Sequence, residues 1–79
     1  MNYDEWAEEY YETARLTEEK IQEYRKKMKN YRNARLLYVY HKRLSILYEM
    51  YDDCMYTADV LRRKADSLRK RGMLKLIIV

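Results

Sequence analysis

The sequence contains no proline and no phenylalanine, one cysteine and one glycine, Gly72. Helices break most often at proline and glycine, so their scarcity predicts long helices and little loop. One glycine cannot build a glycine-rich phosphate-binding loop. Because Cys54 has no second cysteine to pair with, no disulfide forms within the chain, and we expect a reducing cytoplasm.

Long apolar runs are also missing. The longest, 76–79, is far too short to span a bilayer. The start of the chain is acidic, which is the wrong chemistry for a signal or transit peptide. We therefore expect a cytoplasmic protein without membrane contact.

Core-type residues recur at alternating three- and four-residue steps, the spacing of a coiled coil or helical bundle. One series comprises Tyr3, Ala7, Tyr10, Ala14, Thr17, Ile21, Tyr24, Met28 and Tyr31. The other comprises Leu37, Tyr40, Leu44, Leu47, Tyr51, Cys54, Ala58, Leu61, Ala65 and Leu68. The two series do not share a register, and the break lies beside Asn30 and Asn33. This predicts an all-α fold in which helices at about 3–30 and about 33–71 form an antiparallel hairpin.

The proposed domain spans 1–72. The basic end of the second helix precedes Gly72, which we expect to stop it. The following segment, 73–79, is apolar and rich in strand-forming residues, so a non-helical tail is predicted there. A three-helix bundle is the alternative, since Asp52 and Asp53 could cap a third helix.

Charge is arranged in four blocks. Residues 1–24 carry a net charge of −6, 25–47 of +8, 48–61 of −4 and 62–79 of +6, which together give the +4 of the chain. A hairpin folded at about residue 32 would bring like charges together at both of its ends. A second hairpin laid head to tail would neutralise them. We therefore expect an antiparallel homodimer, a four-helix bundle.

Aromatic and thioether side chains flank the second series. Such side chains are enriched at protein interfaces. We predict that they contact an unidentified protein partner in addition to a second copy of the chain. The predicted protein-binding residues are Tyr38, Tyr40, Tyr48, Met50 and Met55.

A basic segment offers an alternative function, because clustered cations neutralise nucleic-acid phosphates. Acidic blocks on the same helices would repel nucleic acid, and no recognised reading motif accompanies the cations, so this reading ranks second. Its residues are Arg25, Lys26, Lys27, Lys29, Arg32 and Arg35.

Catalysis has no support in the sequence. Cys54 falls on the core series, and His41 has no spaced partners that would complete a metal site. The acidic pairs Glu8/Glu9 and Asp52/Asp53 are adjacent in sequence, so their members diverge by about 100° around a helix. We expect a non-enzymatic protein without cofactor or metal.

The segment 43–61, together with the opening 5–10, resembles a group of short uncharacterised proteins from prophages and mobile elements of gut-dwelling bacteria. The tail from Gly72 to Val79 lies outside this pattern. The resemblance implies no activity and no site residues. It suggests a small accessory or host-takeover protein, including an inhibitor of bacterial defence.

Overall fold

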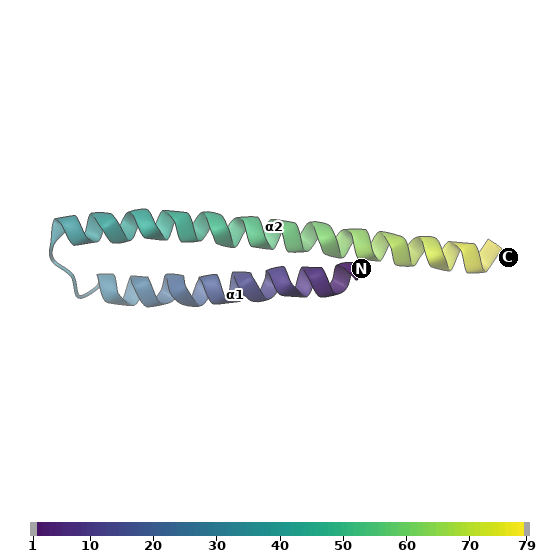
Figure 1. Cartoon of the computed structure of the whole chain (residues 1–79), viewed down its shortest axis with the longest axis horizontal. Coiled ribbons are helices and arrows are strands. Elements are labelled where there is room, and N and C mark those ends of the chain that lie inside the picture. Colours follow the sequence, from purple (N-terminus) through teal and green to yellow (C-terminus); the bar gives the residue numbers. More distant parts are fainter. Residues whose placement is uncertain (1, 79) are drawn as a thin grey trace.

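The protein is a rod made of two antiparallel helices (Figure 1). The computed structural model describes the backbone of residues 2–78 and the side chains of residues 2–71. Helix α1 spans Tyr3–Met28 and helix α2 spans Ala34–Ile78. The molecule measures 69 × 18 × 14 Å, because α2 continues well beyond the start of α1. The predicted all-α hairpin is confirmed.

Helix α1 begins and ends with favourable local chemistry. The Asn2 side chain accepts a hydrogen bond from the backbone N–H of Asp4 at 2.9 Å, which satisfies one of the free donors of the first turn. Acidic residues occupy the first turn and basic residues the last, as the helix dipole favours. The predicted start at Asn2 or Tyr3 is therefore confirmed.

The linker between the helices runs along the rod as well as across it. It comprises residues 29–33, and Figure 1 shows that α2 starts beyond the end of α1. The Asn33 side chain accepts hydrogen bonds from the backbone N–H groups of Arg35 and Leu36, at 2.9 and 3.3 Å. Asn33 thus caps α2, whose first turn contains no acidic residue.

Helix α2 is continuous through Asp52 and Asp53. The three-helix alternative is therefore wrong, because the core series passes this point in phase and no proline or glycine breaks it. The expected stop at Gly72 is also wrong, since the backbone stays helical to Ile78. A single glycine costs a helix only about 1 kcal/mol. The predicted non-helical tail 73–79 is wrong for the same reason, because the backbone of 73–78 is helical.

Small side chains line the contact between the helices. The buried apolar residues are Ala7, Ala14, Ile21, Leu44, Ala58 and Ala65. Four of these six are alanines, and within the described residues no large side chain is fully buried. Alanine lets two helix backbones approach closely but removes little apolar area from water. The hairpin therefore has a thin core.

Two residues predicted for the core are exposed instead. Tyr10 is 39% exposed, because a tyrosine ring does not fit where Ala7 and Ala14 bring the helices together. Leu68 is 48% exposed, since it lies beside Asn2 and Tyr3 at the very start of α1 and has little helix to pack against.

Tyrosine rings close the turn end of the rod. Tyr40 of α2 lies against Tyr24 of α1 at 5.2 Å between ring centroids, and against Tyr31 of the linker at 5.3 Å. Edge and tilted ring contacts of this kind add to the apolar burial. The contact with Tyr31 ties the linker to the helix that follows it.

Replacing Asp53 with proline tests the continuity of α2. We expect a loss of about 3 kcal/mol or more in the free energy of unfolding, because proline removes a backbone hydrogen bond and clashes with the preceding turn. Urea unfolding followed by circular dichroism measures this loss. Asp53→Ala is the control, because it removes the same side chain without the proline ring, and the difference between the two variants measures the effect of proline on the helix backbone. Equal stability of the proline variant would instead place a turn at Asp53.

Candidate functional site

One long side of the hairpin is closed by polar contacts between the helices, and we call it the bridged side. Successive contacts are separated along each helix by three, four or seven residues or by sums of these steps, so they share one flank of the seam. They join Asp4 with Arg69, Glu8 with Arg62 at 3.5 Å, Tyr11 with Asp59 at 2.5 Å and Arg25 with Tyr48 at 3.5 Å.

The hydrogen bond from Tyr11 to Asp59 is the best-formed contact of the bridged side. The Tyr11 hydroxyl donates to a carboxylate oxygen of Asp59. This bond raises the pKa of Tyr11 above its ordinary value of 10.0, because the bond exists only while the hydroxyl keeps its proton. The guanidinium of Arg62 lies 6.0 Å from the centre of the same ring. Tyr11 was absent from the predicted core series and is half-buried.

The bridged side also corrects the predicted charge arrangement at the open end. There, Asp4 meets Arg69 and Glu8 meets Arg62, so opposite charges lie together. The sequence prediction placed like charges at this end because it assumed a symmetric fold at about residue 32. The linker instead shifts α2 along the rod, and the basic segment 62–69 reaches the acidic start of α1.

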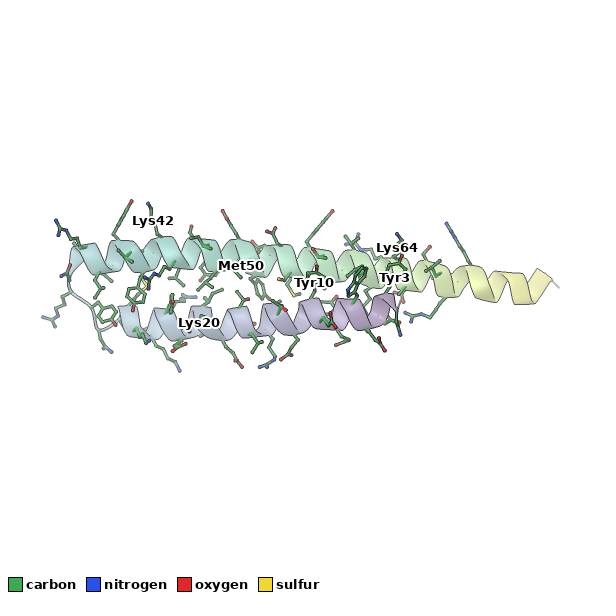
Figure 2. The ribbon with its side chains drawn as sticks, in the orientation of Figure 1. Tyr3, Tyr10, Lys20, Lys42, Met50 and Lys64 are labelled. Atoms are coloured by element: carbon green, nitrogen blue, oxygen red, sulfur yellow. The ribbon has the colours of Figure 1, made fainter. Side chains whose placement is uncertain are left out.

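The opposite side carries exposed apolar residues, and we call it the apolar side. The hydrogen bonds and ion pairs between the two helices that are described above all lie on the bridged side. A shallow depression lies there between Trp6, Glu9, Tyr10 and Thr13. Figure 2 shows Tyr10 and Met50 along the boundary between the two helices. Its exposed large apolar residues are Trp6, Tyr10, Leu16, Leu36, Val39, Ile46, Met50 and Val60.

The predicted protein-binding residues do not share one surface. Tyr40 packs between two other tyrosines, and Met55 is half-buried. Tyr48 belongs to the bridged side, where it accepts a hydrogen bond from Arg25. Tyr38 is 61% exposed beside Lys42. Met50 alone lies on the apolar side.

Most residues of the apolar side were not predicted, because the prediction was based on a single series of core positions along α2. A second series runs beside it at the same alternating spacing, and this pattern was available in the sequence. It comprises Leu36, Val39, Arg43, Ile46, Met50, Asp53, Thr57 and Val60.

The cations of the alternative reading gather at the turn end of the rod. All six side chains from Arg25 to Arg35 are exposed. Among them Lys27 lies near an acid, with its Nζ 3.6 Å from Glu23. Residues 25–47 contain no acid, so this end keeps a strong positive charge. It differs in this from the open end, where cations and carboxylates pair.

The described residues present no cluster of three or more histidine, cysteine or acidic side chains that could hold a metal ion. His41 is exposed and Cys54 is half-buried on the seam. Within the same residues, neither helix has a stretch that is both apolar and long enough to cross a membrane.

Replacing Tyr11 with phenylalanine tests the hydrogen bond to Asp59. A raised pKa in the folded state stabilises the fold fully below pH 10, and this contribution is lost as the pH rises through the pKa of folded Tyr11. We therefore expect the melting temperature of the parent chain to fall more steeply above pH 10 than that of Tyr11→Phe. Tyr56→Phe, at a tyrosine that is 70% exposed, is the matched control. Parallel pH curves for parent and Tyr11→Phe would contradict the bond.

Comparison with known proteins gives this chain no family. No family model matches the sequence, and neither a curated protein nor a solved structure is significantly similar to it. Function must therefore be inferred from the surfaces of the chain itself.

Proposed function

We propose that this chain is a non-enzymatic protein-interaction module that acts through the apolar side and associates with a second copy as an antiparallel homodimer. The observation that carries the proposal is the contrast between the small size of the buried apolar residues and the large size of the exposed ones. The buried core consists mainly of alanines, whereas eight large apolar side chains lie exposed along one side. Large exposed apolar patches mark interaction surfaces in soluble proteins.

Self-association explains both the thin core and the exposed apolar residues. A small domain with a thin core gains stability when a second copy covers its exposed apolar residues. Two hairpins packed along their apolar sides form a four-helix bundle, the arrangement that commonly buries such stripes. The other surfaces of the bundle are then free to contact a foreign protein. The exposed tyrosines Tyr38 and Tyr48 remain candidates for that contact.

The resemblance noted above supports a biological setting. We propose that this chain is such an accessory protein in the cytoplasm, and that inhibition of a bacterial defence protein is one role open to it.

Light scattering tests the homodimer. We expect a mass about twice the 9.9 kDa of the chain at micromolar concentration. Ile46→Glu should yield monomers, because an unpaired charge buried in an apolar interface costs several kcal/mol. Ile46 is 58% exposed in the hairpin, so the hairpin itself should tolerate glutamate. Tyr38→Glu, at a similarly exposed position of the same helix but off the apolar side, should stay dimeric. A monomeric parent chain would refute the proposal.

Nucleic-acid binding is a second candidate function, favoured by the acid-free turn end. An arginine in the first turn of α2 opposes the helix dipole, so the charges there cost stability unless an anion meets them. Binding to a labelled DNA duplex should weaken steeply with salt. Neutralising Lys29, Arg32 and Arg35 with glutamine should reduce the slope of log affinity against log salt by about three.

The matched control for this measurement neutralises Arg63, Lys70 and Arg71, which carry the same charge at the other end of the rod. Loss of affinity with the first triple variant alone supports a site at the turn end. Equal losses with both triple variants, or no binding by the parent chain, would reject it.

A further inference from the structure

The second series of α2 has an unusual symmetry. Read from either end, it places chemically matching residues at equal distances from residue 48. Leu36 and Val60 match in this way, as do Val39 with Thr57 and Ile46 with Met50. The remaining two members are Arg43 and Asp53, which carry opposite charges.

Such symmetry is the requirement of a two-fold interface. When two identical helices pack antiparallel about a two-fold axis, a residue on one side of the centre meets the residue at equal distance on the other side. Antiparallel helical pairs place alternate three- and four-step positions opposite each other in this manner. When a second copy of α2 packs in this way, each apolar residue of the series therefore lies opposite an apolar residue or threonine. Arginine lies opposite aspartate.

We infer that the apolar side is occupied by a second copy of this chain, with the two α2 helices antiparallel and centred on residue 48. In this register Arg43 pairs with the partner's Asp53, and Asp53 pairs with the partner's Arg43. Ile46 and Met50 form the apolar centre, and Leu36 and Val60 its two ends. The inference rests on the proposed function and specifies its partner and geometry.

The state of the two charged residues fits this register. Arg43 and Asp53 are both exposed, and the salt bridges found within the described part of the hairpin include neither. The Arg43 guanidinium lies 5.9 Å from the centre of the Tyr40 ring on its own helix. Two opposite charges that take part in none of these salt bridges, set among apolar residues, are the features that fix register in paired helices.

The rod shape leaves much surface for such an interface. The chain exposes 6805 Å², whereas a compact monomer of 9.9 kDa exposes about 5,200 Å². The excess follows from the elongated shape and is spread over all sides of the rod.

The same register also brings negative charge from a second copy near the positive charge at the turn end. The ion pairs of the bridged side set the start of α1, residues 3–12, level with the basic end of α2. Centring the dimer on residue 48 then places these residues, five of them acidic and none basic, level with about residues 26–38 of the partner. That segment includes the partner's Arg32 and Arg35. Of these acids, Glu9 lines the depression on the apolar side, whereas Asp4 and Glu8 pair with Arg69 and Arg62 of their own hairpin. Glu9 of a second copy thus lies level with the cations that the hairpin leaves unpaired, which favours this occupant over nucleic acid.

Charge reversal tests the register. Arg43→Glu sets glutamate beside the partner's Asp53, and Asp53→Arg sets arginine beside the partner's Arg43, each twice per dimer. We expect the dissociation constant, measured by analytical ultracentrifugation, to rise about 100-fold or more in either variant. The double variant Arg43→Glu/Asp53→Arg restores opposite charges and should recover dimerisation to within about tenfold of the parent chain.

Controls separate this inference from the proposed function. Lys42→Glu and Asp52→Arg reverse the neighbouring charges off the series and should leave the dimer intact. Circular dichroism of each variant checks that the hairpin remains helical, and recovery in the double variant excludes simple misfolding. A dimer indifferent to the reversals at 43 and 53 would refute the register and leave the homodimer standing. A parent chain that is monomeric would refute both.

Discussion

The close approach of the two helices through alanine is the constraint on which the rest of the structure depends. Ala7 and Ala14 of α1 and Ala58 and Ala65 of α2 are buried, so little room remains between the backbones. Large side chains that follow the same periodicity are consequently displaced to the flanks, as Tyr10 is. The contacts between the helices fix their register but bury little apolar area. A partner that covers the exposed apolar residues would therefore stabilise the hairpin.

The two flanks of the seam between the helices have different roles. Polar contacts such as that of Tyr11 with Asp59 close one flank and fix the register of α1 on α2. The other flank has apolar residues where such contacts would be, and the salt bridges of the described residues include neither Arg43 nor Asp53. A hairpin with one sealed side and one apolar side is suited to pairing in a single orientation, because only one side gains from losing water.

Much of the local structure could be predicted from the sequence. The spacing of core residues predicted two helices and their continuity through Asp53, and the asparagines at 2 and 33 marked the helix starts. The stop at Gly72 was wrong because one glycine is a weak signal against a helix that favourable neighbours continue. The predicted binding residues were scattered over several surfaces, since a property shared in sequence does not place side chains on one face.

The sequence by itself determined the helices and their apolar periodicity, because both depend on interactions between residues three or four apart. The axial offset between the helices was decided only by the tertiary structure. It depends on how the linker runs and on which small residues meet, and neither is a local property. That offset brought Arg69 to Asp4 and Arg62 to Glu8.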